Sequence, residues 1–295
     1  MKPLVSILIP AFNAEEWIAS TLQSAIAQTW PRKEIIVVDD GSTDRTAEVA
    51  RRFASKSVAV LSKQNEGAAS ARNHALRVSH GDYIQWLDAD DLLAPDKIEK
   101  QLAALREGID DNRTLLSCAW ADFDHDVEYA TFKPTSLWQD LSPTQWLMRR
   151  MSENLYMQTA TWLTSRELTE AAGPWNPRLL SDDDVEYFCR VLLAATGTRF
   201  VPEAKVFYRN TPSPNRLSYV GSSNAKKDAL LLSLRLQIQY LRSVDNGELS
   251  RKACLTYLQH SSRRFYPGRP DIFLELQNLA ANLQGQIETL QLLKL

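Results

Sequence analysis

The 295-residue sequence has few cysteines and little net charge, and each shortage excludes a class of protein. Its three cysteines, Cys118, Cys189 and Cys254, lie far apart and form no Cys-x-x-Cys or Cys/His spacing. This pattern argues against a structural zinc site and against a disulfide-rich secreted scaffold. The formal net charge of −2 includes no basic excess, so we do not expect nucleic acid as a partner.

Long apolar runs are also missing. Residues 4–9 are apolar but too few for the core of a signal peptide, and nowhere do 18 apolar residues occur together. We therefore expect a soluble cytoplasmic protein, either free or in peripheral contact with the inner face of a membrane.

Two common nucleotide-binding motifs are absent as well. No Gly-x-Gly-x-x-Gly follows the first predicted strand, and no Gly-Lys-Ser/Thr phosphate loop occurs. A classical dinucleotide oxidoreductase and a P-loop enzyme are therefore disfavoured. The first strand ends instead in Pro10, Phe12 and Asn13, which offer a ring on which a base can stack. Taken alone, Phe12 fits a core position better than a ligand contact.

What the sequence does contain is a regular alternation of strands and helices. Apolar, β-rich runs at residues 5–9, 34–38, 58–61 and 83–87 are separated by three helical patterns. This rhythm predicts an α/β fold with an open, Rossmann-like, doubly wound sheet and helices on both faces. Such sheets bind their ligands at the carboxyl ends of the strands.

The second half of the chain is less regular. We expect a helix over residues 95–106, strands at 115–121, 198–201 and 206–208, an ordered segment at 160–164, and a mobile loop at 210–224 that is a candidate lid. Residues 225–295 predict three helices, broken at 245–247 and 267–270. We therefore divide the chain into residues 1–221, with halves 1–106 and 107–221, and a C-terminal helical region, 222–295.

The last predicted helix carries an apolar stripe. Its members recur every three or four residues: Leu276, Leu279, Leu283, Ile287 and Leu290. Such a stripe either packs back on the same chain or forms the seam of a homodimer, and we favour the former.

An acidic cluster, Asp88, Asp90 and Asp91, directly follows the apolar strand at residues 83–87. At about 4 Å, two carboxylates repel by roughly 4 kcal/mol at an effective dielectric constant near 20, so a divalent cation is the natural compensation. Oxygen ligands favour magnesium, manganese or calcium over zinc. Capping of the following helix is the alternative for two of these acids. The same predicted edge also receives Asn13, Asp39 and Asp40, which favours a ligand site.

Four motifs in order resemble the family 2 nucleotide-sugar glycosyltransferases of the GT-A fold. They are VSILIPAFN at residues 5–13, IVVDDGSTD at 36–44, NEG at 65–67 with ARN at 71–73, and DADD at 88–91. The match is close over residues 4–106 and extends more weakly to Arg209.

This resemblance implies an inverting, metal-dependent transfer of a sugar from a nucleotide-sugar donor, UDP-linked by the same resemblance, to an acceptor hydroxyl. The cofactor would be Mg²⁺ or Mn²⁺, held by Asp90 and by Asp91, which alternatively contacts the sugar. Asp40, alone or with Asp39, would bind the uracil. The full set of implied donor-binding residues is Pro10, Phe12, Asn13, Asp39, Asp40, Asn65, Arg72, Asp88 and Arg209.

A second acidic cluster, Asp182, Asp183 and Asp184, opens a predicted helix. Asp184 lies six residues before Arg190, which is the spacing between the acid and the arginine of the family's Glu-Asp motif. The resemblance therefore implies that Asp184 is the catalytic base, with Asp183 as its neighbour. Asp replaces the usual Glu at position 183 and Asp182 adds a third acid, so the register can shift by one. Helix starts also attract aspartate through the macrodipole, which alone explains one or two of the three.

The sequence says least about the acceptor. Trp175 and Asp182 are candidate acceptor contacts, with burial of Trp175 in the core as the favoured alternative. The Gln-x-x-Arg-Trp motif of processive synthases does not occur, so we expect single additions to a glycan, lipid-linked or protein acceptor, in cell-surface glycan or polysaccharide synthesis. Two alternatives stay open: a nucleotidyltransferase that makes nucleotide sugars, and a catalytically degenerate donor-binding scaffold.

Overall fold

The predicted alternation forms a sheet in the computed structural model, which describes residues 2–106, 112–210, 223–265 and 268–288. Its strands are β1 (Val5–Ala11), β2 (Lys33–Asp39), β3 (Val58–Ser62), β4 (Tyr83–Trp86) and β8 (Thr164–Ser165), in the order β3-β2-β1-β4-β8. The first four run parallel, and β8 joins β4 in the antiparallel sense. Parallel strands bring their carboxyl ends to one edge, so the polar residues after β1, β2 and β4 share a rim.

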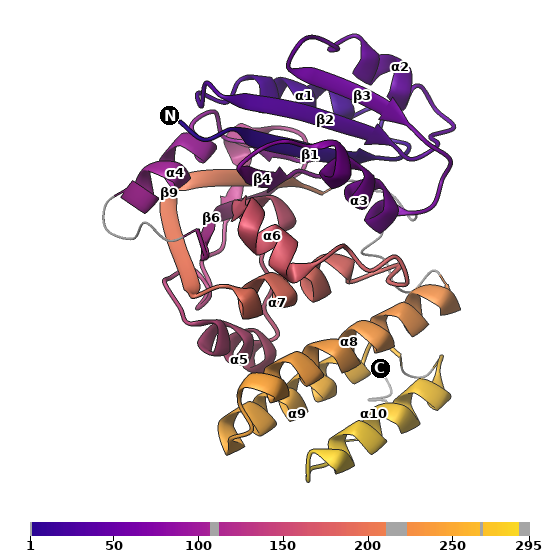
Figure 1. The fold of residues 1–295 in the computed structure, drawn as a ribbon. Coiled ribbons are helices and arrows are strands. Elements are labelled where there is room, and N and C mark those ends of the chain that lie inside the picture. Colours follow the sequence, from indigo (N-terminus) through magenta and orange to yellow (C-terminus); the bar gives the residue numbers. More distant parts are fainter. Residues whose placement is uncertain (1, 107–111, 211–222, 266–267, 289–295) are drawn as a thin grey trace.

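Helices cover this sheet as the alternation predicts (Figure 1). They are α1 (Ile18–Ile26), α2 (Thr46–Arg51) and α3 (Ala68–Val78), each joining two strands that follow one another in the chain. All residues of β1 except Pro10 are buried, because helices pack on both faces of the strand.

A second, mixed sheet follows in the chain. It contains β5 (Leu92–Leu93), β6 (Thr114–Phe123), β7 (Thr131–Phe132) and β9 (Gly197–Arg209), in the order β5-β9-β6-β7. The two strands expected at 198–201 and 206–208 are a single strand, β9, which has a bulge opposite Cys118 and Ala119. Pro202 lies in this bulge, where a residue without a backbone N–H is tolerated.

The remaining elements of the first 210 residues are helical. They are α4 (Lys97–Arg106), the short 3-10 helix η1 (Val127–Tyr129), α5 (Pro143–Glu153), the 3-10 helix η2 (Thr159–Thr161), α6 (Arg166–Ala172) and α7 (Asp183–Ala194). The segment at 160–164, which we expected to be ordered, begins in η2 and ends in β8. The Gln158 side chain accepts a hydrogen bond from the Ala160 N–H, and the Thr161 hydroxyl donates to the Gln158 carbonyl, which stabilises the helical turn of η2.

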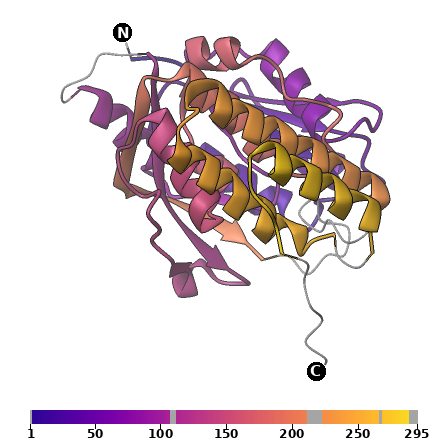
Figure 2. The same ribbon diagram turned by 90° about the horizontal axis from the view of Figure 1, so that it is seen from below.

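Three helices form a layer on one side of the molecule (Figures 1 and 2). α8 (Asn224–Val244), α9 (Glu248–Ser262) and α10 (Pro270–Asn282) confirm the expected helices and both breaks. α8 packs against α7 and α9 against α5, and their buried side chains join the same hydrophobic core as the sheets. The boundary at 221/222 and residues 211–222 of the candidate lid lie outside the described residues.

The apolar stripe of the last helix packs on its own chain. Leu276 is fully buried in α10, and Ile287, beyond the helix, is 6% exposed. This matches packing on the same chain, while a homodimer stays a prediction. Leu290 lies outside the described residues. None of the described helices combines the length and the apolar character that a bilayer crossing requires.

Candidate active site

The loop after β1 is tied to the loop after β2. Asn13 adopts a left-handed conformation with φ of 49°, and its amide oxygen accepts a hydrogen bond of 2.9 Å from the Thr43 N–H. The Asn13 N–H donates to the Ser42 hydroxyl at 3.0 Å. The amide oxygen and the backbone N–H of Asn13 therefore already have hydrogen-bond partners within the protein. Its neighbour Phe12 leaves about half of its surface (49%) exposed beside this loop, and Pro10 is partly buried in β1.

The two aspartates at the end of β2 have different surroundings. Both are buried, and the Asp40 carboxylate accepts from the Gly67 N–H at 2.7 Å and from the Lys63 ammonium at 2.9 Å. It therefore holds the loop that contains Asn65. The Asp39 carboxylate accepts one long bond, 3.3 Å, from the Ser42 N–H. Its second oxygen has no hydrogen-bond donor among the described residues.

The first acidic cluster contains one buried and two partly exposed aspartates. Asp88 and Asp90 are partly exposed, whereas Asp91 is fully buried. Asp91 accepts hydrogen bonds from the Arg209 N–H at 2.9 Å and from the Gln158 side chain. Burial, together with the charges of Asp90 and Asp88, raises the pKa of Asp91 well above its ordinary value. Asp91 thus fastens the end of β4 to β9, and both of its oxygens already have protein donors.

Arg209 lies beneath this cluster. Its Nε donates to the Asp90 carbonyl at 2.9 Å, and its guanidinium carbon lies 4.7 Å from the Trp17 ring centre and 4.4 Å from that of Phe123. Burial lowers the pKa of Arg209. The position is compatible with the predicted contact to a diphosphate, and it also stabilises the backbone that carries Asp90.

Arg72, on α3, connects the two acidic clusters. Its Nη2 donates to Asp88 at 2.8 Å and its Nη1 to Asp183 at 2.7 Å. The guanidinium is 4% exposed, and its Nε finds no hydrogen-bond acceptor in the part of the chain that the structure describes. The structure therefore joins the predicted donor residue Asp88 and Asp183, the neighbour of the predicted base, through one buried cation.

Asp184 presents a partly exposed carboxyl group at the start of α7. The Thr159 hydroxyl donates to it at 3.3 Å, and Asp184 lines a small pocket with Arg150, Tyr156 and several apolar side chains. Burial raises the pKa of Asp184 to about 7, and the nearby charge of Asp183 adds to the effect. A carboxyl group that titrates near neutrality suits a general base. Asp183 is different, because its carboxylate is buried against Arg72.

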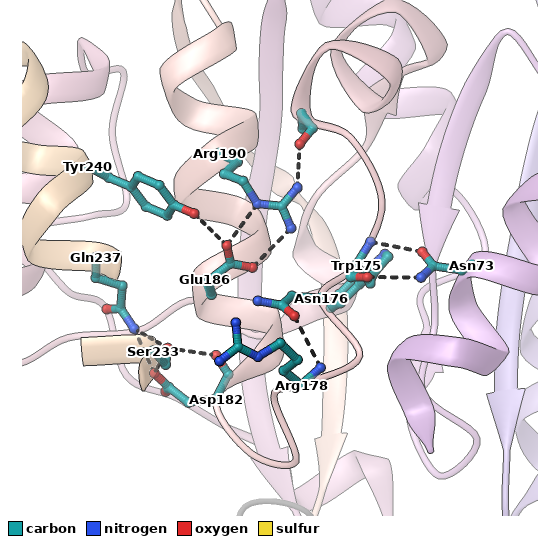
Figure 3. Close-up of polar contacts among 11 residues, drawn as sticks. Asn73, Trp175, Asn176, Arg178, Asp182, Glu186, Arg190, Ser233, Gln237 and Tyr240 are labelled. Carbon is teal, nitrogen blue, oxygen red and sulfur yellow. Dashed lines mark hydrogen bonds and ion pairs between the residues drawn. The ribbon is translucent and has the colours of Figure 1, made fainter. Parts of the chain in front are cut away.

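The two candidate acceptor contacts, Trp175 and Asp182, both make contacts within the protein. Trp175 is fully buried, stacks on Tyr187 with ring centres 4.1 Å apart, and lies under the Arg72 guanidinium. Its backbone N–H and carbonyl pair with the Asn73 side chain at 2.8 and 2.9 Å, as Figure 3 shows. Trp175 therefore fills the core, as the favoured alternative had it. One carboxylate oxygen of Asp182 accepts hydrogen bonds from side chains of α8, and its contact with an acceptor stays a prediction.

Several residues around the site were not expected from the sequence. Thr159 and Gln158 contact site residues far along the chain, and no sequence pattern marks them. Asn73 lies in the ARN motif at 71–73, but the motif gave no sign of its contact with Trp175. Lys63 lies just before the Asn65 motif, and its position two residues after a predicted strand was a usable signal. Arg190, which set the register of the second cluster, pairs with Glu186 at 2.9 Å. It orders α7 and does not touch the acids.

The described residues contain no group of three or more metal-ligating side chains arranged around one point. Asp88 and Asp90 nevertheless offer partly exposed carboxylates on the rim. Mg²⁺ is commonly bound by one or two carboxylates, with water and substrate phosphates completing the shell. The donor set therefore fits a metal that is held jointly with a diphosphate.

Comparison with known proteins agrees with this geometry. The family model described as Glycosyl transferase family 2 matches residues 6–160. The putative teichuronic acid biosynthesis glycosyltransferase TuaG of Bacillus subtilis is 41% identical over 109 residues, which cover 36% of this chain and 43% of TuaG. An uncharacterized glycosyltransferase of Rickettsia typhi, RT0329, is 38% identical over 123 residues, which cover 42% of this chain and 38% of that protein. The chain thus matches about two fifths of the length of these curated relatives.

Among solved structures, TarS 1-349 of S. aureus in complex with UDP-GlcNAc superposes with a TM-score of 0.75. The alignment covers 95% of this chain and 81% of TarS 1-349 at 18% sequence identity. At that identity the likeness establishes the fold. The C-terminal helices are part of the matched region, because nearly the whole chain is covered.

Proposed function

This chain belongs to glycosyl transferase family 2, and from that premise we propose that it transfers a sugar from a UDP-linked donor to an acceptor hydroxyl with inversion at the anomeric carbon. One observation carries the proposal. A partly exposed carboxyl group with a pKa near 7, that of Asp184, directly follows Asp183, which Arg72 joins to Asp88 on the acidic rim where a donor diphosphate would be held.

The nucleoside end of the site is the most specific part. We assign the uracil contact to Asp39, because its free oxygen can accept from the ring N3–H, while Asp40 already holds the loop of Asn65. The exposed ring of Phe12 lies beside the loop after β1 and can pack on the base. The TarS 1-349 complex contains UDP-GlcNAc, which supports a uridine nucleotide here.

The diphosphate end requires a cation. Asp90 and Asp88 would hold Mg²⁺ or Mn²⁺ together with the phosphate oxygens, while Asp91 supports the loop from below. When bound, the metal would offset the negative charge that develops on the departing UDP. Arg72 keeps Asp88 in position, and Arg209 holds the Asp90 backbone.

The base end completes the reaction. Asp184 would take the proton from the acceptor hydroxyl as that oxygen attacks the anomeric carbon opposite the UDP leaving group. One base and one leaving-group site give inversion, whereas retention in glycosidases uses paired carboxylates close together. The burial of Asp183 against Arg72 leaves Asp184 as the accessible acid of the pair.

The acceptor class follows from the relatives rather than from the site. One relative's name refers to teichuronic acid biosynthesis, and a glycan, lipid-linked or protein acceptor in cell-surface glycan or polysaccharide synthesis fits this. A protein that docks at the inner face of a membrane would reach such acceptors.

The test is a panel of UDP-GlcNAc, UDP-glucose, UDP-galactose and GDP-mannose, assayed for slow donor hydrolysis with and without Mn²⁺. We expect a UDP-sugar to be hydrolysed only with the metal. Asp184→Asn should lower the rate by about 10²- to 10⁴-fold while UDP still binds. Release of pyrophosphate from UTP and a sugar 1-phosphate would instead indicate a nucleotidyltransferase. Donor binding without any turnover would indicate a scaffold.

A further inference from the structure

The third acid of the second cluster, Asp182, is held by one face of helix α8. The Ser233 hydroxyl and the Gln237 amide each donate to the same carboxylate oxygen of Asp182 at 2.7 Å. On the same helix, the Lys226 carbonyl accepts from Ser181 at 2.9 Å and the Tyr240 hydroxyl donates to Glu186 at 2.7 Å. The α8 positions 226, 233, 237 and 240 lie at helical spacing, so they share one face.

Figure 3 shows the resulting arrangement: α8 contacts the first two turns of α7 from one side, while Asn73 of α3 holds Trp175 from the other. The segment between Trp175 and Asp184 is therefore fixed at both ends. An apolar contact would have sufficed to pack two helices together. The polar contacts converge instead on the acid that lies two residues before the base.

The backbone at Asp182 makes these contacts informative. Asp182 has φ of 58° and ψ of 23°, a left-handed conformation that is uncommon outside glycine and costs on the order of 1 kcal/mol. Its side chain forms no capping hydrogen bond to its own helix. The turn that presents Asp184 is thus stabilised by α8 and not by local capping.

From Gln237, further hydrogen bonds lead to the buried guanidinium of Arg150. The side-chain amide oxygen of Gln237 accepts from the Tyr257 hydroxyl of α9 at 3.0 Å, and Arg150 of α5 donates to that hydroxyl at 3.0 Å. Arg150 is 4% exposed, and none of the described residues accepts from its Nε or Nη1. A buried chain therefore links the Asp182 carboxylate to a guanidinium through three helices.

We propose that Asp182 is a positioning residue for the reaction: hydrogen-bonded to Ser233 and Gln237, it fixes the turn that presents Asp184 and holds its own carboxyl group two residues before that base. The C-terminal helices would thereby set both the position and the proton affinity of the base. This inference rests on the proposed role of Asp184.

The influence of Asp182 on the pKa of Asp184 can be measured separately from that of the other charged groups nearby. Burial raises the pKa of Asp184 to about 7, the charges of Asp183, Asp182 and Asp88 add to that rise, and the Arg72 guanidinium opposes it. Arg150 and Tyr156 line the same pocket, and Thr159 donates to Asp184. Of the three additional acids, Asp182 alone lies neither at the acidic rim nor in an ion pair with Arg72.

The first experiment measures the titration of Asp184 in the full chain by ¹³C NMR of labelled aspartate carboxyl groups, with the signal assigned by its loss in Asp184→Asn. Asp182→Asn keeps the side-chain shape and removes the charge, so the apparent pKa of Asp184 should fall by roughly one pH unit. The control is Asp124→Asn, an exposed aspartate after β6, which should leave the titration unchanged. An unchanged titration in Asp182→Asn would overturn the inference.

The second experiment tests positioning without changing any charge. Gln237→Met removes the amide donor, and it should lower kcat for hydrolysis of the UDP-sugar that the wild type turns over by about tenfold, with KM within twofold. Gln239→Met, on the exposed face of the same helix, is the matched control and should match the wild type. Parallel losses of kcat, UDP binding and melting temperature would instead indicate a purely structural contact.

The two proposals fail in different ways. A wild-type protein that neither binds UDP nor hydrolyses a UDP-sugar contradicts the proposed function, while the NMR titration still decides the effect of Asp182. A wild-type enzyme that is active while Asp182→Asn leaves its pH profile unmoved and Gln237→Met leaves its kcat unmoved contradicts only the positioning role.

Discussion

At the scale of single residues, the aspartates of the site differ in what their carboxyl groups touch. The carboxyl oxygens of Asp40 and Asp91 accept hydrogen bonds from protein donors, so these two residues shape loops. Asp39 and Asp184 keep oxygens available and are the better candidates for contact with substrate. Motif spacing identified all four positions. It could not divide them by role, because the division depends on donors that arrive from other parts of the chain.

The titration of Asp184 should lower the free energy of unfolding as the pH rises. A folded-state pKa of about 7 for Asp184 means that the native protein binds this proton more tightly than the unfolded chain, whose ordinary aspartate pKa is near 3.9. The contribution of this proton is fully present below pH 4 and is lost as the pH rises to 7. Asp184→Asn should therefore be more stable than the wild type at pH 8, by on the order of 2 kcal/mol, with little difference at pH 4.

Urea unfolding of the wild type and Asp184→Asn at pH 4 and pH 8 measures this directly. Asp124→Asn serves as the control, because it removes an exposed carboxylate of the same size. The same difference between wild type and Asp184→Asn at both pH values would show that Asp184 titrates normally. It would also weaken its assignment as the base.

Arg72 should be the most costly single residue of the site to remove. Arg72→Met leaves Asp88 and the buried Asp183 without their cation, and breaking a buried ion pair costs about 3–5 kcal/mol. The measurement is the free energy of unfolding in urea at pH 7, with Arg77→Met, an exposed arginine on the same helix, as control. A loss below about 0.5 kcal/mol would mean that the pair does not form.

The partners of Arg72 show the limit of sequence reasoning at this scale. The resemblance placed Arg72 near the nucleotide and diphosphate, and the structure does bring it to Asp88. Its second partner, Asp183, lies 111 residues further along the chain, where no local pattern links the two. Such a pair becomes visible only once the sheet has brought α3 and α7 together.

At the scale of elements, the turn after β2 controls the loop at residues 63–67. Gly41 has φ of 73°, and a Cβ there would lie 2.8 Å from the Asn65 backbone nitrogen. Gly67 also has a positive φ, 92°, but has open space around it. Substituting alanine at Gly67 therefore tests backbone strain alone, whereas substituting alanine at Gly41 tests strain together with a steric clash.

Gly41→Ala should displace the Asn65 loop and weaken UDP binding, and it should destabilise the fold by about 1–3 kcal/mol. Gly67→Ala should show only the strain of its backbone, about 1 kcal/mol, and should bind UDP more tightly than Gly41→Ala. Thermal unfolding and UDP titration of both variants test this. Equal losses in the two variants would show that the close approach to Asn65 does not matter.

The elements that the sequence predicted best are those with strong periodicity. The four parallel strands and the three C-terminal helices agree with the apolar patterns, because each buries a regular face. The errors fall where side chains override the pattern. We expected two short strands where β9 continues through a bulge that contains Pro202, and the Gln158 side chain stabilises a 3-10 turn that no pattern had predicted.

At the scale of the whole molecule, the C-terminal helices are part of the same core as the sheets. Buried residues of α8 and α9, among them Leu234, Leu241 and Leu258, join the cluster that contains Leu147 and Met151 of α5. The family model ends at residue 160, yet the fold of TarS continues over nearly the whole chain. We therefore expect no independent folding of the first 210 residues.

A chain that ends at residue 210 should expose the apolar faces of α5 and α7 and lose cooperative thermal unfolding. A chain that ends at residue 288 retains α8–α10 and Ile287, and it should unfold like the full protein. Calorimetry and size-exclusion chromatography of the two chains make the comparison. A soluble 1–210 chain with an unchanged melting temperature would mean that the helical layer is a separate domain.

The most direct test of the account is isothermal titration calorimetry of the full chain with UDP, in the presence and absence of Mn²⁺. We predict saturable binding with the metal, a loss of most of that binding without it, and a comparable loss in Asp90→Asn, while Asp124→Asn binds like the wild type. Absence of binding heat with UDP, GDP or dTDP in the presence of either Mn²⁺ or Mg²⁺ would contradict it.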